Sequence, residues 1–136
     1  MREILFRAKR VKTYCASQDW TYGVPFIDHE GDCIFKTDTT ERVVDPETVG
    51  QYTGLTDKNG TKIFEGDIVE GHCHSQWSHR LQRCVIEYYR EGFEARHYVE
   101  QGGFMRYYSY KVLFSKDVVV IGNIHDNPEL LKGGAE

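Results

Sequence analysis

Apolar and polar side chains alternate with a period of two along several short stretches, which is the pattern of a β-strand with one buried face. Near the start, Ile4, Phe6 and Ala8 would share one side of such a strand, and the residues between them the other. No stretch has the 3.6-residue apolar period of an amphipathic helix of three or more turns. The pattern therefore predicts a mainly β fold.

Turn-forming residues divide these stretches into hairpins. Three pairs of strands are predicted: 24–27 with 33–36, 52–55 with 61–64, and 83–89 with 93–98. In the second pair, Asn59-Gly60 supplies the positive φ angles of a tight turn. Glu65-Gly66-Asp67 predicts a further turn, like the one that opens a strand in small SH3-like barrels. These hairpins predict coiled sheets or a partly open barrel with an SH3-like element.

Two short helical turns are predicted at prolines. Asp45 would cap a turn that starts at Pro46, and Asn127 a short C-terminal helix that starts at Pro128. Because no Ser- or Pro-rich linker interrupts the chain, a single domain over residues 1–131 with a loose tail at 132–136 is the simplest division.

Three segments carry a more specific signal. They are MREILFRA at 1–8, QYTGLTDKNGTKIFEGDIV at 51–69 and VIGNIHDNPELL at 120–131. Together, and in this order, they resemble the YopX family of phage and prophage proteins. The family often has Trp-Asp after its opening Phe-Arg-Ala, where this chain has Lys9-Arg10. Turn chemistry explains most residues of the middle segment, so we interpret it as a folding signature rather than a site.

The resemblance implies a mostly β, coiled-sheet architecture, a viral or prophage origin and a cytoplasmic site of action in a bacterial host. Because the family is of unknown function, the resemblance implies no activity and brings no catalytic residues.

Charge and composition narrow the classes of function. The net charge of −4 and the pI near 5.9 disfavour strong nonspecific binding to nucleic acid. The longest apolar run, Val118 to Ile121, is far too short to span a bilayer. The four cysteines have no CxxC spacing and no apolar leader precedes them, so we expect reduced thiols.

His72, His74 and His79, the His cluster, are the first candidate site. On a strand, His72 and His74 point to one face, and imidazoles bind Zn²⁺. Structural zinc sites usually have two tight ligand pairs, and the second pair is missing here, so we expect a polar loop and no cofactor. Cys73 would point away from both neighbouring histidines, which argues against a Cys–His catalytic pair. Because no catalytic fingerprint is present either, we expect no enzyme.

A second candidate is the Tyr/Arg strand, which consists of Arg106, Tyr107, Tyr108, Tyr110 and Lys111. Tyr88, Tyr89 and Arg90 could join the same surface from a neighbouring strand. Aromatic and basic side chains on a sheet can stack bases, form a protein interface, or simply cover the sheet. We favour a non-enzymatic phage accessory protein that binds a phage or host protein through a β-rich surface, as a homo-oligomer. The alternatives are a single-stranded nucleic-acid binder that uses this strand and a metal-dependent enzyme that uses the His cluster.

Overall fold

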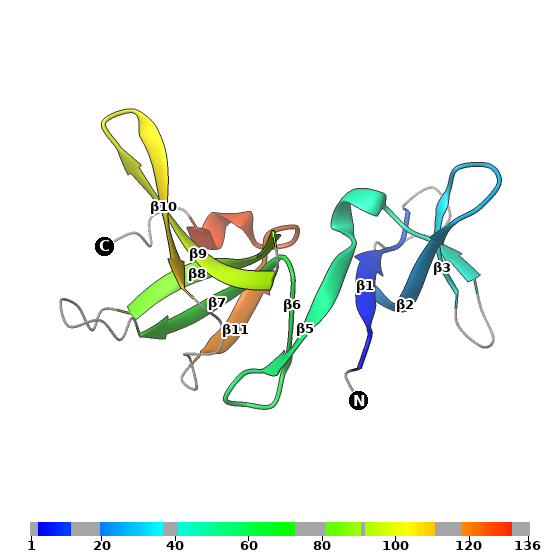
Figure 1. Cartoon of the computed structure of the whole chain (residues 1–136), viewed down its shortest axis with the longest axis horizontal. Helices are drawn as coiled ribbons and strands as arrows, with labels where there is room; N and C mark the ends of the chain where they lie inside the picture. The colour runs from blue at the N-terminus through cyan, green and yellow to red at the C-terminus, as the bar shows by residue number, and fades with distance from the viewer. Residues whose placement is uncertain are drawn as a thin grey trace. The chain divides into compact units, whose positions relative to one another are not determined.

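The computed structural model describes residues 3–11, 20–36, 41–72, 81–90, 92–110 and 118–131, without the side chains of 72, 99–101 and 104–110. The chain packs as two compact units, Met1–Gly54 and Leu55–Glu136, and each is described by itself (Figure 1). One folding domain over 1–131 stays a prediction, because compactness alone does not say whether the units unfold together. The expected tail at 132–136 lies outside the described residues.

The first unit is an antiparallel sheet in the order β4-β3-β2-β1-β5. Its elements are β1 (Phe6–Lys9), β2 (Trp20–Ile27), β3 (Cys33–Lys36), β4 (Glu41–Val43), the 3-10 turn η2 (Pro46–Thr48) and β5 (Gly50–Thr56). The predicted hairpin pairs Ile27 with Cys33 across the acidic loop. The Asp45 carboxylate accepts the backbone N–H of Glu47, so the predicted cap at Pro46 is confirmed.

The core of the first unit lies on one face of this sheet. Phe35 and Ala8 are fully buried there, and they pack with Cys33 and Val44. Phe6 and Ala8 lie on the same face of β1, as the alternation in the sequence predicts.

The second unit contains an antiparallel sheet in the order β10-β9-β8-β7-β11. Its elements are β6 (Lys62–Phe64), β7 (Asp67–His72), β8 (Leu81–Tyr89), β9 (Gly92–Gln101), β10 (Phe104–Tyr110), β11 (Val119–Asn123) and the 3-10 turn η4 (Pro128–Leu131). The predicted hairpin of β8 and β9 turns at Arg90, whose φ is 55°. Its core includes Ile63, Val69, Cys84, Ile86, Ala95 and Val118.

These elements confirm the mainly β prediction. Over the part of the chain that is described, the strands form two antiparallel sheets that do not close into a barrel. The predicted C-terminal helix is wrong in type, because residues 128–131 form only a 3-10 turn. Asn127 does not cap it with its side chain; the Asn127 amide oxygen instead accepts the backbone N–H of Asn123 at 3.3 Å.

Asp57 fixes the loop between β5 and β6. One carboxylate oxygen accepts the N–H groups of Asn59 and Thr61, at 2.8 and 2.9 Å, and the other accepts the N–H of Val120 at 3.0 Å. Gly60 has a φ of +82°, as predicted, whereas Asn59 does not have a positive φ. The hairpin is therefore closed by a side chain and tied to β11 by the same carboxylate.

Asp67 and Gly66 form the second predicted turn. The buried Asp67 carboxylate accepts the N–H of Phe64 at 2.8 Å, and Gly66 adopts a φ of +90°. The Asn123 side-chain oxygen likewise accepts the N–H groups of His125 and Asp126. These polar residues of the middle and end segments hold turns together, which supports their interpretation as a folding signature.

Cys33 and Cys84 are buried in different cores and are not joined by a disulfide. Burial raises the pKa of the Cys33 thiol, so Cys33 is a packing residue rather than a nucleophile. The expectation of reduced thiols stays a prediction, and Cys15 and Cys73 lie outside the described residues.

Candidate functional site

The His cluster is only partly within the described residues. His72 ends β7, where its backbone pairs with Leu81 of β8. His74 and His79 lie outside the described residues, as does Cys73. The expectation that these histidines hold no zinc therefore stays a prediction, and a zinc site stays the alternative to it.

The Tyr/Arg strand is present as backbone. Arg106 to Tyr110 belong to β10, where Tyr107 pairs with Tyr98 and Tyr108 with His97 of β9. Lys111 lies outside the described residues. The prediction of a strand is confirmed, while its use as an interaction surface stays a prediction.

The neighbouring residues Tyr88, Tyr89 and Arg90 are described in full. Tyr88 and Tyr89 are exposed at the end of β8. The Tyr88 ring packs edge-on against Phe93, with ring centroids 5.1 Å apart. The guanidinium groups of Arg90 and Arg96 lie 5.2 and 4.7 Å from the centre of the Tyr89 ring.

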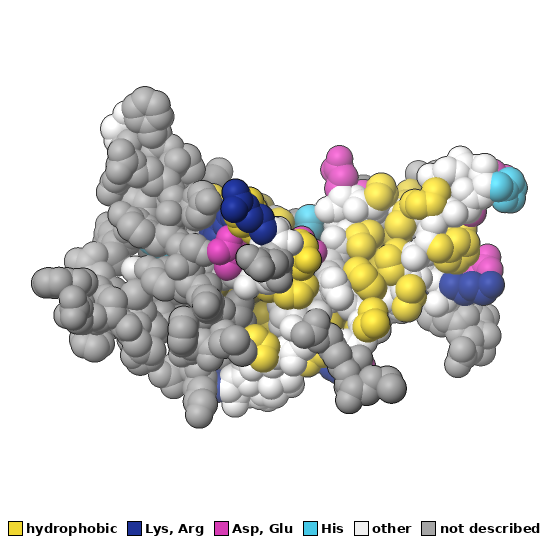
Figure 2. Space-filling model, viewed as in Figure 1, with side chains coloured by type: hydrophobic (Ala, Val, Ile, Leu, Met, Phe, Trp, Pro, Cys, Tyr) yellow, Lys and Arg dark blue, Asp and Glu magenta, His cyan; other side chains and the backbone are white. Residues whose placement is uncertain are grey.

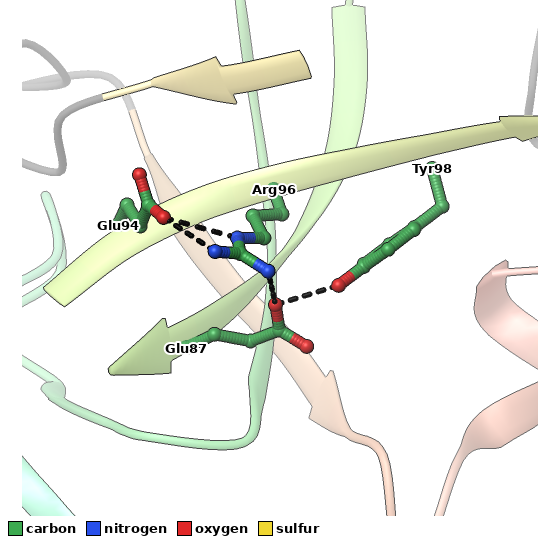
Figure 3. A network of polar contacts seen from close by, with 4 residues as sticks. All are labelled: Glu87, Glu94, Arg96 and Tyr98. Carbon is green, nitrogen blue, oxygen red and sulfur yellow. Dashed lines mark hydrogen bonds and ion pairs between the residues drawn. The ribbon is translucent and has the colours of Figure 1, made fainter. Parts of the chain in front are cut away.

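Arg96 belongs to a network of polar contacts on β8 and β9 (Figure 3). Its guanidinium lies between two carboxylates, with Glu87 at 3.1 Å and Glu94 at 2.7 Å. The Tyr98 hydroxyl donates to Glu87 at 2.6 Å. Burial and the hydrogen bond to Glu87 raise the pKa of Tyr98, so this phenol stays protonated as a donor.

This network stabilises the sheet and leaves little positive charge for a ligand. The Arg96 side chain is only 12% exposed, and its two carboxylate partners more than neutralise it. A phosphate would have to displace both carboxylates. The chemistry at this position is that of a structural ion pair, not of an anion site.

A surface that the sequence interpretation missed lies on β2. Tyr22, Val24 and Phe26 occupy alternate positions and share one face of the strand, and their exposed fractions are 49%, 55% and 39%. We call these three residues the β2 face. In its sheet, β2 pairs with β1 over Trp20 to Gly23 and with β3 over Val24 to Ile27. Figure 2 shows hydrophobic side chains gathered on one side of the first unit.

Three cationic side chains stand on the same face in the sheet register, of which Arg7 is buried, Lys9 is half-buried and Lys36 is exposed. The sheet register places Arg7 beside Tyr22, Lys9 beside Trp20 and Lys36 beside Val24. The Arg7 guanidinium lies 4.6 Å and the Lys9 ammonium 5.7 Å from the centre of the Trp20 ring. The Lys36 ammonium lies 6.0 Å from the centre of the Phe26 ring.

One carboxylate accompanies these cations in the register. Glu41 pairs with Lys36, and their charged groups are 3.7 Å apart. Both side chains are more than half exposed, so this ion pair is weak and open to exchange with another carboxylate.

The small residues that alternate with the β2 face along the strand show why the β2 face points to solvent. Thr21 is buried, and Gly23 packs close enough to Phe35 that an added Cβ would lie 3.7 Å from the Phe35 side chain. Phe35 thus fills the space beneath a strand of small residues. The bulky residues of β2 are consequently left on the solvent side.

A third cluster is acidic. Carboxylates of Asp28, Glu30 and Asp32 lie within 4.8 Å of one another in the loop between β2 and β3. One Asp28 oxygen accepts the N–H groups of Glu30 and Asp32. These hydrogen bonds close the turn, so they account for an aspartate at position 28 without a metal ion.

Comparisons with known proteins identify the family. No helix in the described ranges is long and apolar enough to cross a membrane. None of the curated proteins matches the chain. The crystal structure of protein EF1440 from Enterococcus faecalis is similar, with a TM-score of 0.56 and 25% sequence identity over 97% of this chain and 100% of that one. The model of the YopX protein family matches residues 5–132, nearly the whole chain. The chain therefore belongs to the YopX family.

Proposed function

We propose that this chain is a non-enzymatic phage or prophage accessory protein that binds another protein through the β2 face. The observation that supports this most strongly is the exposure of Tyr22, Val24 and Phe26 at alternate positions on one face of β2. Contiguous apolar side chains on a protein surface mark interaction sites, and aromatic residues are enriched in the centre of interfaces.

The use of polar groups in the second unit supports a binding role over catalysis. Asp57 and Asp67 are occupied by turn N–H groups, and Glu87 and Glu94 by Arg96. A catalytic carboxylate needs access to a substrate proton or atom. These four carboxylates serve the fold instead.

Self-association is part of the same proposal. β10 ends its sheet in the strand order, and an edge strand exposes backbone groups that another strand can pair with. Such pairing between copies would leave the β2 face, which lies in the first unit, to a different partner.

The β2 face can be tested with a display library of short random peptides. Since hot-spot residues supply most of the binding energy, peptides selected on the wild-type chain should bind at the β2 face. We expect the Val24→Asp variant to bind these peptides at least about tenfold more weakly, because a buried, unpaired carboxylate is costly in an interface.

The matched control is Ile27→Asp on the same strand. Ile27 is 64% exposed but lies outside the β2 face, on the opposite side of β2. This variant should bind the selected peptides like the wild type. Peptides that lose affinity equally for both variants, or for neither, would contradict the proposal.

A further inference from the structure

We infer that the second unit associates with a second copy of the chain by pairing β10 with β10, antiparallel, about a two-fold axis at Tyr107. The inference rests on the self-association in the proposed function and names the strand and the register of the contact. β10 is the last strand in the order β10-β9-β8-β7-β11, and no strand in the described part of the chain pairs with its outer side. The contact would join two five-stranded sheets into one continuous sheet.

The opposite end of the same sheet is already occupied. The backbone carbonyl of Val118, just before β11, accepts the N–H of Lys58 at 3.1 Å, and the N–H of Val120 donates to Asp57 at 3.0 Å. The pairing of β11 with β7 is also irregular between Val120 and Gly122. Bulges and covered backbone groups keep an edge strand from pairing. A head-to-tail contact of β10 with β11 of another copy, which would build an open fibre, is therefore disfavoured.

β10 shows none of these protective features. Its seven residues, Phe104–Tyr110, pair with β9 without a register shift, and they include no proline and a single charged residue, Arg106. By contrast, the strand at the end of the first sheet, β4, has only three residues, and two of them are charged. A long, regular edge strand with little charge is a template for another strand.

The turn before β10 shows which backbone groups face outward. Gly102 and Gly103, with φ angles of 59° and 83°, connect Gln101 to its partner in the register, Phe104. Two central residues with positive φ are typical of a type I′ turn, and the pair that closes such a two-residue turn exchanges both backbone hydrogen bonds. Hydrogen-bonded and non-hydrogen-bonded pairs then alternate along the hairpin. The backbone groups that point away from β9 are therefore those of Met105, Tyr107 and Ser109.

Antiparallel pairing about Tyr107 uses all of these outward groups. Tyr107 would lie opposite Tyr107 of the second copy, and Met105 opposite Ser109, so each outward N–H and C=O meets a partner. Because Tyr107 is also the middle residue of β10, the two strands would overlap over their full length.

The residue types in this register are self-complementary. Phe104 would lie opposite Tyr110, and Arg106 opposite Tyr108, which are aromatic pairs and cation–aromatic pairs. An axis at Arg106 would instead place two arginines opposite each other, and like charges in direct opposition destabilise a sheet. This self-complementarity favours a second copy over a strand of an unrelated protein.

The experiment measures the molar mass of the full chain by light scattering at micromolar concentration. The wild type should have about twice the 15.8 kDa of one chain. Tyr107→Lys and Tyr107→Glu should each weaken the dimer at least about tenfold and lower the mass toward that of one chain, because like charges then lie opposite each other on the axis. An equimolar mixture of the two variants should recover the dimer, since a lysine then lies opposite a glutamate.

Met105→Lys is the matched control. It adds the same charge at another outward-facing position of β10, but opposite Ser109 rather than opposite itself, so it should keep the wild-type mass. Recovery in the mixture separates a charge effect from misfolding, because two misfolded variants would not restore each other.

The outcomes separate this inference from the rest of the proposed function. A wild-type mass of one chain would overturn the β10 pairing and the self-association, and leave protein binding through the β2 face standing. An oligomer that Tyr107→Lys leaves intact, or that the mixture of variants does not restore, would overturn the β10 register alone. Failure of the peptide selection at the β2 face would overturn that surface and leave the β10 pairing standing, because the two lie in different units.

Discussion

Asp57→Asn offers the sharpest test of the fold, because the substitution keeps the shape of a side chain that is only 6% exposed. Both carboxylate oxygens of Asp57 accept backbone N–H groups. An asparagine has one acceptor oxygen, so its NH₂ group must face either the turn or the N–H of Val120. A lost part-buried hydrogen bond to a charged group costs about 2 kcal/mol.

That cost corresponds to a melting midpoint lowered by roughly 6 °C for a chain of this size. Asp28→Asn is a matched control in the first unit. There a single carboxylate oxygen accepts both N–H groups, and the amide oxygen of an asparagine can do the same. We expect its midpoint to change by less than about 2 °C.

The pH dependence gives an independent check. Burial alone would raise the pKa of Asp57, but the hydrogen bonds from Val120, Thr61 and Asn59 and the charge of Lys58 outweigh it and lower the pKa. A carboxyl with a lowered pKa in the folded state stabilises the fold above its unfolded-state pKa, and the contribution disappears as the pH falls through the folded-state value. The difference in stability between wild type and Asp57→Asn should therefore narrow on going from about pH 7 to about pH 3. Equal midpoints for the Asp57 and Asp28 variants, or a difference that does not narrow in acid, would refute this reasoning.

Four further predictions follow from single features. Gly60→Val should cost roughly 1 to 3 kcal/mol, because a β-branched residue is strained at a φ of +82°, whereas Gly92→Val, at an ordinary φ and with equally open space, should melt close to wild type. Gly122→Ala should lower the melting midpoint, since the added Cβ would lie 2.6 Å from the Asn127 side chain; an unchanged midpoint would mean that η4 moves away freely. EDTA should leave the melting midpoint unchanged, because we expect no structural zinc at the His cluster; one equivalent of tightly held metal and a large drop on chelation would contradict this. Light scattering should give a mass well above the 15.8 kDa of one chain at micromolar concentration, and a monomer mass would reject self-association.

Turn chemistry explains why so much of the fold could be predicted. Two turns of the structure occur at the Gly, Asn and Asp residues that predicted them: the turn between β5 and β6, and the turn at Glu65-Gly66-Asp67. Few other residues tolerate the backbone angles of such turns or close them with a side chain. The C-terminal helix failed by the same local reasoning. Pro128 starts a turn as predicted, but the Asn127 side-chain oxygen accepts the N–H of Asn123 instead of an N–H of the turn.

Long-range contacts decided what local patterns could not. The tie from Asp57 to Val120 joins residues 63 positions apart, and no turn rule predicts it. Arg96 shows the same limit, because its contact with Glu87 joins two strands and no local pattern predicts it.

The β2 face illustrates the limit of strand periodicity most clearly. From Trp20 to Phe26 the sequence alternates bulky apolar residues with Thr21, Gly23 and Pro25, and a period of two does not say which set is buried. The usual preference would bury the bulky set, but here Thr21 and Gly23 lie on the side of the fully buried Phe35, and the bulky residues lie on the other side. In the segments 51–69 and 120–131, which resemble the family, turn geometry restricts which residue types can occupy the turns. No turn restricts the residue types at Tyr22, Val24 and Phe26. Packing beneath β2 explains why these residues face outward but does not require them to be bulky and apolar, and binding is the explanation that the peptide selection tests.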